Sequence, residues 1–362
     1  MGLLRTGKRV DGFTSRIMIR NISIDDFLGA EEKMVLADVR SPGEYAHGHV
    51  PGAVNLPLFS DEERARVGTT YKQVGREEAI LLGFDLTGNK WSGFIRAALE
   101  MAPGKRIAVH CWRGGMRSGV MAWALDLYGF EVFVIQGGYK SYRQWARRQF
   151  VFSRDFRILG GMTGSGKTRL LATLRAMGEQ VLDLEDLAQH QGSSYGTMNK
   201  MVQPTQEQFE NNLAWQLKDL EAERQVWVED ENMNIGRIII PRPLWENIQQ
   251  APTLNIEVDR EDRIAYLVQE YGSLDPDFLT ECTKRIHKRL GPLQTTQALA
   301  AIREGRIADF IKLVLVYYDK AYHKALAKKD PGGLFTLRLT GGSDAENARL
   351  LSDFNQTIAT GK

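Results

Sequence analysis

The chain contains little cysteine, no long apolar run and almost no excess of charge of either sign. Cys111 and Cys282 are its only cysteines, which excludes a disulfide-stapled fold and is typical of a cytoplasmic protein. No apolar run approaches the roughly 18 residues that a membrane-spanning helix needs, and the first residues lack the apolar core of a signal peptide. We therefore expect a cytoplasmic protein with no membrane partner.

The charges of the chain nearly cancel. Lys and Arg number 47 and Asp and Glu 45, so the net charge is +2. A histone-like polycation is thereby excluded, and any contact with nucleic acid must come from local basic patches. With 362 residues, of which 43% are hydrophobic, the chain is long enough for two or three domains that each bury a core.

Short apolar runs alternate with helical stretches in both halves of the chain, which predicts an α/β fold with parallel sheets. Strands are expected at 34–39, 107–110, 132–135, 156–159, 181–184, 226–228, 254–258 and 335–339, and helices at 118–128, 169–177 and 204–223, the last capped by Thr205. The pattern is mostly helical over 260–329. The sequence predicts an N-terminal extension over 1–15, a first domain over 16–148 and a second over 149–362, with a helical insertion at about 260–330.

The second domain opens with a phosphate-binding pattern, GxxxxGK[ST], between a predicted strand and a predicted helix. Backbone N–H groups of such a loop converge on phosphate oxygens, and the helix N-terminus adds positive potential. The lysine neutralises the outer phosphate and the threonine can hold Mg²⁺. The residues concerned are Gly161, Gly164, Ser165, Gly166, Lys167 and Thr168.

Acidic residues follow two of the predicted strands of this domain. Asp183, Glu185 and Asp186 come after one, and Glu229, Asp230 and Glu231 after the other. Either group could supply the carboxylate that binds a metal ion beside a phosphate loop. We favour Asp230, which ends the stronger strand pattern, with Asp183 as the second candidate.

A reactive thiol is predicted in the first domain. Cys111 begins a loop, His110-Cys111-Trp-Arg-Gly-Gly-Met-Arg117-Ser118, that connects a strand with a helix. N–H groups and the helix dipole that point at a sulfur lower its pKa and favour the nucleophilic thiolate. Arg113 and Arg117 add charge that favours both the thiolate and a bound oxyanion. Cys282 lies in a helical stretch without such a loop and is expected to be structural.

The thiol loop is similar to that of two families. The spacing HC-x5-R-S resembles protein-tyrosine phosphatases, whereas the surroundings resemble a rhodanese domain. The rhodanese-like segments are Asp38-Val39-Arg40, Glu44-Tyr45, His49 to Asn55, and Gln136-Gly137-Gly138 through Trp145. The loop is one residue longer than is usual in sulfurtransferase rhodaneses, which gives room for a tetrahedral phosphate-like group beside the chalcogen.

A rhodanese-like domain followed by a phosphate-loop domain resembles the tRNA 2-selenouridine synthase family over nearly the whole chain. The segment Arg66 to Gly75, which plain rhodaneses lack, belongs to this resemblance. It implies an enzyme that converts wobble 2-thiouridine of tRNA into 2-selenouridine with selenophosphate, through an S-geranylated intermediate made from geranyl diphosphate. Selenophosphate would then bind in the loop of Cys111, held by Arg113 and Arg117, and the phosphate loop would bind the diphosphate. These co-substrates require no tightly bound cofactor.

A tRNA partner requires contacts with phosphates, and basic residues cluster in two further places. The candidates are Arg143, Arg147 and Arg148 at the domain junction and Lys284, Arg285, Lys288 and Arg289 in the helical part. The alternative functions are a rhodanese-fold phosphatase or a sulfurtransferase, fused to an ATP-dependent phosphate-loop domain.

Overall fold

The structure is a computed structural model that describes residues 19–190, 195 and 202–360. The chain divides into two compact units, of which the first ends at Trp145 and the second begins at Ala146. The extension predicted for residues 1–15 lies outside the described residues.

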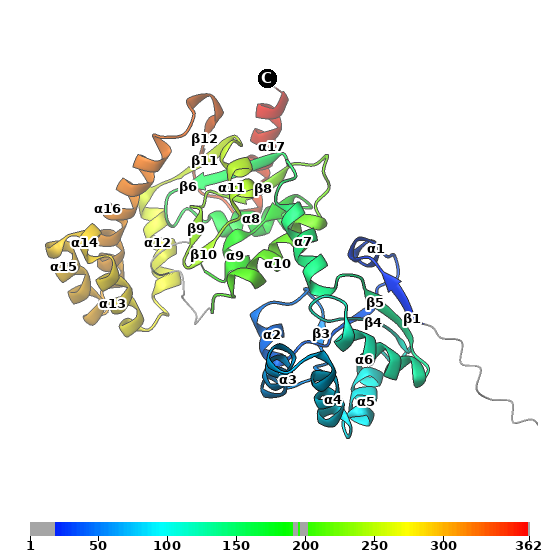
Figure 1. Cartoon of the computed structure of the whole chain (residues 1–362). Coiled ribbons are helices and arrows are strands. Elements are labelled where there is room, and N and C mark those ends of the chain that lie inside the picture. The colour runs from blue at the N-terminus through cyan, green and yellow to red at the C-terminus, as the bar shows by residue number, and fades with distance from the viewer. Residues whose placement is uncertain (1–18, 191–194, 196–201, 361–362) are drawn as a thin grey trace, which may run out of the picture. The chain divides into compact units, whose positions relative to one another are not determined.

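The first unit is built on a sheet of five parallel strands in the order β1-β5-β4-β2-β3. These strands are β1 (Ile19–Ile22), β2 (Val35–Asp38), β3 (Val54–Asn55), β4 (Arg106–His110) and β5 (Glu131–Ile135). Its helices are α1 (Ile24–Leu28), α2 (Pro42–His47), α3 (Asp61–Gln73), α4 (Arg76–Thr87), α5 (Trp91–Met101), α6 (Met116–Leu127) and the first part of α7 (Gly138–Gln149), which continues into the second unit (Figure 1). The central strands carry continuous apolar side chains that are buried among helices, as parallel sheets require.

The second unit contains another sheet of five parallel strands, in the order β12-β11-β6-β8-β7. Its strands are β6 (Phe156–Gly161), β7 (Gln180–Leu182), β8 (Val226–Glu229), β11 (Thr253–Val258) and β12 (Leu334–Leu339), and a small hairpin is formed by β9 (Asn234–Ile235) and β10 (Ile238–Ile239). Every residue of β6 is buried. Since β6 is the middle strand of the five, the loop that follows it begins at the centre of the sheet.

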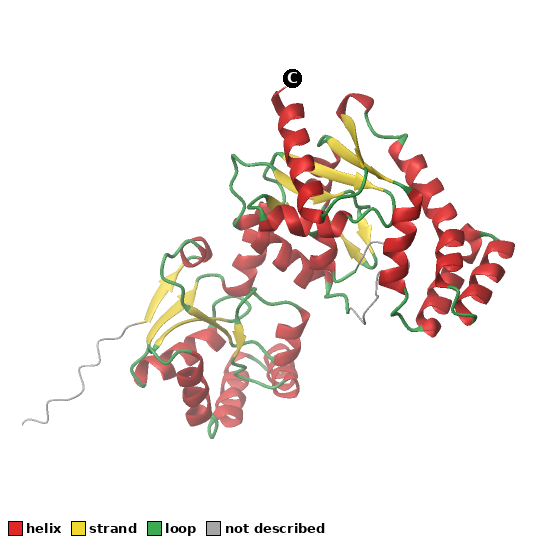
Figure 2. Cartoon of the chain, turned by 180° about the vertical axis from the view of Figure 1, so that it is seen from behind, coloured by secondary structure: helices red, strands yellow, loops and turns green. Residues whose placement is uncertain are grey.

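Helices flank this second sheet and also form a separate group (Figure 2). Those near the sheet are α8 (Lys167–Ala176), α9 (Leu184–Ala188), α10 (Gln206–Lys218), α11 (Arg242–Gln249) and α17 (Asp344–Thr360). The others are α12 (Arg260–Tyr271), α13 (Pro276–Arg285), α14 (His287–Leu290), α15 (Pro292–Arg303) and α16 (Ile307–Leu326). They share a core of their own, which contains Cys282 and Phe310.

The α/β architecture predicted from the sequence, with its helical C-terminal part, is confirmed. Thr205 is the N-cap of α10 and accepts a 3.0 Å hydrogen bond from the Gln208 N–H. Helix α6 begins at Met116, two residues before the predicted start, because Gly115 already adopts the non-helical cap conformation. No helix of the described ranges is long and apolar enough to cross a membrane.

Candidate functional sites

Cys111 lies at the carboxyl end of β4, where the chain turns into α6. The side chain is buried, with 4% of its surface exposed. Its Sγ accepts a 3.3 Å hydrogen bond from the Gly115 N–H and lies 3.3 Å from Ser118 Oγ. Burial by itself raises the pKa of the Cys111 thiol, but hydrogen bonds from Ser118, Arg113 and Gly115 outweigh it and hold the pKa below its ordinary value. The loop therefore favours the thiolate.

Among the described residues, neither arginine side chain of this loop makes a hydrogen bond to the sulfur. Arg117 Nη1 pairs with Glu44 Oε2 at 2.6 Å, and the Arg113 side chain is exposed. Burial raises the pKa of Glu44, but the Arg117 guanidinium, the Ser41 N–H and the charge of Arg64 together outweigh it, and the pKa lies below its ordinary value. Backbone N–H groups of the loop and the Ser118 hydroxyl, rather than a guanidinium, thus surround the sulfur.

Buried groups hold the thiol loop from the adjoining segments of the first unit. The Tyr139 N–H donates to the Cys111 carbonyl at 2.9 Å. Arg40, 1% exposed, pairs with Asp38 and lies 3.8 Å from the centre of the Tyr139 ring. Gly138 has a positive φ of 58° and would place a Cβ only 2.3 Å from the Cys111 carbonyl oxygen. Only glycine fits there.

The phosphate loop connects the central strand β6 with α8, as the pattern predicts. Gly164 and Gly166 have positive φ values of 82° and 78°, which glycine adopts without strain. Lys167 Nζ donates to the Gly161 carbonyl at 2.9 Å and lies 3.4 Å from Glu229 Oε1. Ser165 is buried, and its hydroxyl makes no hydrogen bond among the described residues.

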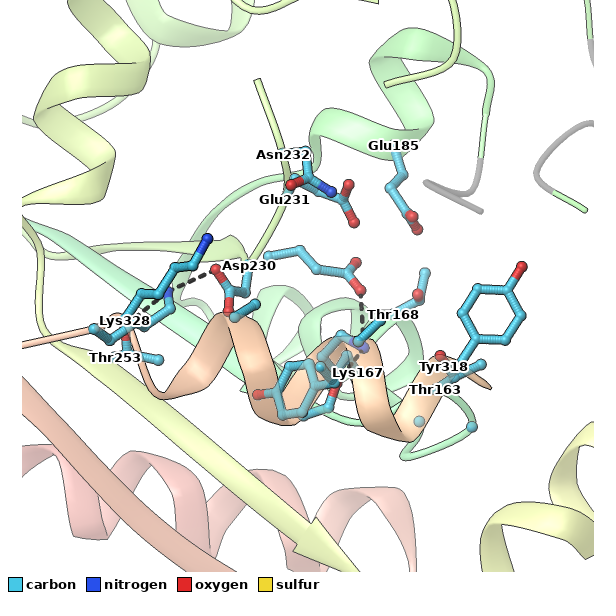
Figure 3. Close-up of a pocket in the computed structure, with 18 of the residues that line it drawn as sticks. Thr163, Lys167, Thr168, Glu185, Asp230, Glu231, Asn232, Thr253, Tyr318 and Lys328 are labelled. Carbon is cyan, nitrogen blue, oxygen red and sulfur yellow. Dashed lines mark hydrogen bonds and ion pairs between the residues drawn. The ribbon is translucent and has the colours of Figure 1, made fainter. Parts of the chain in front are cut away.

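A cavity of about 1190 Å³ opens beside this loop (Figure 3). Gly161, Gly164, Gly166, Lys167 and Thr168 line it from the loop. Five tyrosines of the helical group also line it, namely Tyr266 and Tyr271 of α12 and Tyr317, Tyr318 and Tyr322 of α16. The glycine-rich loop with its lysine and a group of aromatic side chains therefore line one cavity.

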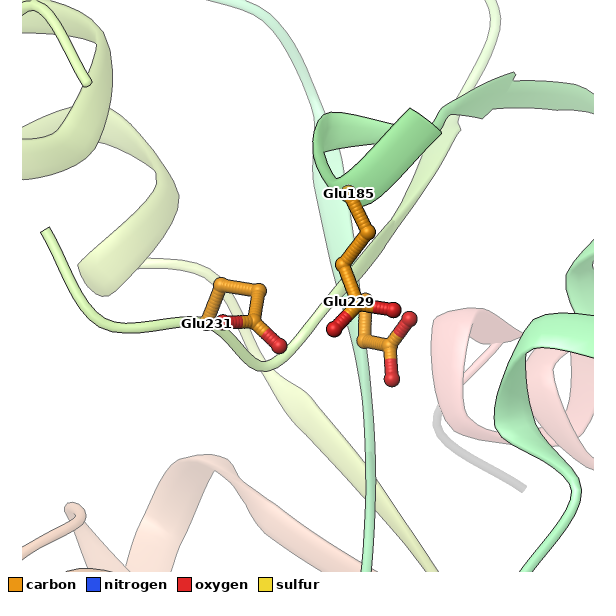
Figure 4. A group of neighbouring side chains, drawn as sticks. All are labelled: Glu185, Glu229 and Glu231. Carbon is orange, nitrogen blue, oxygen red and sulfur yellow. The ribbon is translucent and has the colours of Figure 1, made fainter. Parts of the chain in front are cut away.

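Three glutamates meet at the same cavity (Figure 4). One carboxylate oxygen from each of Glu185, Glu229 and Glu231 lies within 4.8 Å of the other two. Burial and the neighbouring acids raise the pKa of Glu185 to about 10 and that of Glu231 to about 8, and also raise the pKa of Glu229.

Neither acid favoured from the sequence belongs to this cluster. Asp230 lines the cavity but pairs with Lys329 at 2.7 Å, and Asp183 caps α9 by accepting from the Asp186 N–H at 2.9 Å. Glu229 and Glu231 were named beside Asp230 as possible ligands but were not favoured, although residues two apart on an extended chain point to the same side while the one between them points away. This alternation along the sequence could have identified the two glutamates as neighbours.

Two family models match the chain. One, described as "Rhodanese-like domain", matches residues 25–144, and the other, described as "tRNA 2-selenouridine synthase AAA domain", matches residues 154–340. Three proteins named tRNA 2-selenouridine synthase are similar along most of their length. The one from Nitrosomonas europaea is 34% identical over 88% of this chain and 81% of its own, that from Marinobacter nauticus 35% over 84% and 92%, and that from Sulfurovum sp. 40% over 71% and 75%.

The chain belongs to the tRNA 2-selenouridine synthase family. The resemblance expected from the sequence is thus confirmed. In this family member the rhodanese-like match covers the Cys111 loop, and the AAA match covers both the phosphate loop and the glutamate cluster.

The basic residues nominated as tRNA contacts differ in their accessibility. Arg147 and Arg148 on α7 are exposed, as are Lys284, Arg285, Lys288 and Arg289. The last four lie on two helices, α13 and α14, because the chain departs from helical geometry at Ile286. Arg289 also lines the cavity. Arg143 is only 8% exposed, so its nomination is corrected: a buried guanidinium is not available to a phosphate.

Proposed function

We propose that this chain converts wobble 2-thiouridine of tRNA into 2-selenouridine, with selenophosphate as the selenium donor and an S-geranylated nucleoside as the intermediate. Membership in the tRNA 2-selenouridine synthase family supports the overall reaction. The observation that carries the two-stage scheme is that the chain contains a thiolate-stabilising loop and, separately, a phosphate loop beside an aromatic-walled cavity. Each stage needs one of these sites.

In the first stage, geranyl diphosphate occupies the cavity beside the phosphate loop. Loop N–H groups and Lys167 stabilise the diphosphate, and the isoprenoid chain lies against the tyrosines of α12 and α16. The sulfur of 2-thiouridine attacks the first carbon of the geranyl group, the carbon–oxygen bond breaks and diphosphate leaves. The nucleobase loses its N3 proton, so the product is a neutral thioether whose sulfur is a good leaving group.

In the second stage, selenophosphate binds at the Cys111 loop. Its oxygens face the loop N–H groups and the side chains of Arg113 and Arg117. Arg117 has to break its ion pair with Glu44 in order to bind the anion. Selenium adds to carbon-2 of the base and geranylthiol leaves. Water then cleaves the selenium–phosphorus bond and releases phosphate, which leaves 2-selenouridine on the tRNA.

The test compares Lys167→Ala with Cys111→Ser in the full chain, supplied with thiolated tRNA, geranyl diphosphate and selenophosphate. Digested tRNA is analysed by mass spectrometry. We expect Lys167→Ala to leave 2-thiouridine unmodified, and Cys111→Ser to accumulate geranylated thiouridine without selenouridine. Thr173→Ala, a change of a partly buried hydroxyl that donates to the Arg169 carbonyl on the same helix α8, and Cys282→Ala serve as controls that retain both steps.

Two results would overturn this proposal. One is normal selenouridine formation by both variants. The other is consumption of ATP at the phosphate loop while geranyl diphosphate fails to bind, which would favour an ATP-dependent sulfurtransferase. Hydrolysis of an aryl phosphate by Cys111 without RNA or selenium would favour the phosphatase alternative.

A further inference from the structure

The loop that buries the Cys111 sulfur leaves a large aromatic side chain at its surface. Trp112 directly follows Cys111 in the chain, and 38% of its surface is exposed, whereas Cys111 is 4% exposed. Consecutive Cα atoms lie about 3.8 Å apart, so the indole and the sulfur leave the backbone at adjoining points. The exposed part of the indole is therefore accessible to a molecule that approaches the thiol loop.

Buried groups hold this indole from its inner side. The centre of the ring lies 5.7 Å from the centre of the Tyr139 ring and 6.0 Å from the guanidinium carbon of Arg40. Tyr139 and Arg40 are 0% and 1% exposed, so the part of the indole that contacts them faces inward and the exposed part faces away from them. The Lys140 N–H also donates to the Trp112 carbonyl at 3.0 Å. Both the backbone and the ring of Trp112 are thus held in place.

Trp112 is the outer end of a column of aromatic rings that continues along α7. The ring centres of Tyr139 and Tyr142 are 6.1 Å apart, and those of Tyr142 and Trp145 are 5.4 Å apart. Tyr139 and Tyr142 are 0% exposed and Trp145 is 5% exposed, so Trp112 is the member of the column that reaches solvent. A side chain that is already ordered by its neighbours loses little conformational entropy when a ligand contacts it. Trp112 therefore presents a preorganised flat surface.

We propose that the exposed indole of Trp112 is the surface on which the nucleobase of the substrate tRNA stacks while it reacts at the Cys111 loop. The inference rests on the proposed function, which brings an unpaired wobble base to this loop. Proteins recognise unpaired RNA bases by stacking them on aromatic side chains, and such stacking tolerates any base because each has a flat π surface. Trp112 would thus be a substrate-binding residue of the second stage.

The charge beside the indole favours a nucleotide over an isoprenoid chain as its occupant. Arg113 follows Trp112 and is exposed, so a flat apolar surface and a cation lie next to each other in the loop. A nucleotide joins a flat base to an anionic phosphate and can contact both. The geranyl chain of the intermediate has no charge for Arg113 to bind, and it is the alternative occupant that the test has to separate.

The test measures how the full-length protein converts geranylated tRNA, prepared by chemical alkylation of thiolated tRNA, in the presence of selenophosphate. Loss of the stacking surface in Trp112→Ala should raise the KM for this tRNA about fivefold or more, with a smaller effect on kcat. Trp112→Phe keeps an aromatic ring and should recover most of the affinity. Trp112→Leu keeps an apolar side chain without a ring, and should behave like Trp112→Ala.

Two controls separate a contact with the substrate from a role in the fold. Trp123→Ala removes an indole on α6 that is 56% exposed, and should leave the KM unchanged. The pH at which Cys111 ionises should be the same in Trp112→Leu and in the unaltered protein, because the hydrogen bonds to the sulfur come from Ser118 and Gly115. A shifted ionisation in Trp112→Leu would show that the indole shapes the loop, and would contradict the proposal.

Binding measured without catalysis distinguishes failure of this inference from failure of the proposed reaction. A base that stacks on an indole quenches its fluorescence, so thiolated tRNA should quench emission that is missing in Trp112→Phe. If the unaltered protein forms no selenouridine from geranylated tRNA, the proposed reaction is wrong, and the dissociation constants of the variants for thiolated tRNA decide on the stacking. The inference is wrong if Trp112→Leu binds tRNA as tightly as the unaltered protein does. It is equally wrong if Trp112→Leu and Trp112→Phe have the same affinity, since the indole would then serve only as an apolar surface.

Discussion

At the scale of single residues, the chemistry of Cys111 depends on hydrogen bonds rather than on the charge of nearby arginines. Ser118 and the loop N–H groups contact the sulfur, whereas Arg117 is paired with Glu44. The arginine side chains are therefore not used to hold the sulfur, although Arg117 has to leave Glu44 before it can meet a substrate anion. It also makes the pKa of Cys111 a property of a few atoms that can be altered one at a time.

The first prediction concerns the pH at which Cys111 ionises. Because its pKa lies below the ordinary value near 8.5, thiolate absorbance that is lost in Cys111→Ser should titrate at a lower pH than a free cysteine. Ser118→Ala should move this midpoint upward, since the sulfur loses a neighbouring hydroxyl donor. Difference ultraviolet absorbance of the two proteins across a pH series provides the measurement.

The sign of the linked stability follows from the same shift. An acid with a depressed pKa stabilises the folded protein above the pKa of the unfolded chain, and this contribution is lost as the pH falls through the folded pKa.

Ser273→Ala, which removes an exposed hydroxyl in the second unit, is the control for the Cys111 titration and should leave its midpoint unchanged. An unshifted midpoint in Ser118→Ala would show that the hydroxyl does not act on the sulfur.

At the scale of secondary-structure elements, two strand–loop–helix units perform related tasks. In each, a central parallel strand ends in a loop whose N–H groups and following helix present positive potential, once around a sulfur and once toward a phosphate. The thiol loop also packs closely against the start of α7. There the backbone of Gly138 lies where any larger residue would collide with Cys111 and Gly114.

The second prediction is that Gly138→Ala unfolds the first unit more easily. The added Cβ would lie 2.3 Å from the Cys111 carbonyl oxygen and 2.5 Å from the Gly114 nitrogen, and the residue has a positive φ. Overpacking against backbone and the unfavourable dihedral angle together cost about 2 to 4 kcal/mol. Urea unfolding of the full chain, followed by tryptophan fluorescence, measures the loss.

Gly119→Ala provides the matched control for that change. Gly119 lies within α6, and a Cβ there meets no atom within 4 Å. Alanine is the better helix former by about 0.5 to 1 kcal/mol, so this variant should be slightly more stable. Equal effects of the two substitutions would mean that the close approach at Gly138 does not constrain the loop.

At the scale of the whole molecule, the second unit carries a helical group with its own core beside the sheet. That group contributes the aromatic wall of the cavity through α12 and α16, and it presents the exposed basic residues of α13 and α14. One group of helices thus carries both aromatic side chains of the cavity and the basic residues proposed to contact tRNA. Arg289 belongs to both sets, because it is exposed and also lines the cavity.

The third prediction concerns the salt dependence of tRNA binding. Each phosphate contact that is lost should reduce the slope of log affinity against log salt by roughly 0.7 to 0.9. Lys288→Ala and Arg289→Ala should therefore bind tRNA more weakly at low salt and with a shallower slope. Filter binding across a series of salt concentrations measures both quantities.

Arg242→Ala is the control for tRNA binding. Arg242 is exposed but is paired with Glu246 on α11, so its removal should leave the slope unchanged. If Lys288→Ala and Arg289→Ala keep the slope of the unaltered protein, α14 does not contact tRNA.

The sequence by itself determined the parts of this protein that depend on local patterns. The strands β2, β4, β5, β6, β7, β8, β11 and β12, the helical stretch after residue 260, the cap at Thr205 and the two glycine-rich loops all follow from hydrophobic periodicity and from glycine and capping chemistry within a few residues. Their order along the chain also carried the family resemblance, because motif spacing survives when the rest of the sequence changes.

Only the tertiary structure decided which side chains meet. Glu229 rather than Asp230 faces Lys167, and Glu44, 73 residues away in the chain, is the partner of Arg117. The tyrosines of the cavity wall come from helices roughly 100 residues and more beyond the phosphate loop, and the burial of Arg143 is not visible in its basic surroundings. Local patterns specify how the backbone turns, whereas the partner of a charged group depends on which distant residues the packed sheets and helices bring within reach.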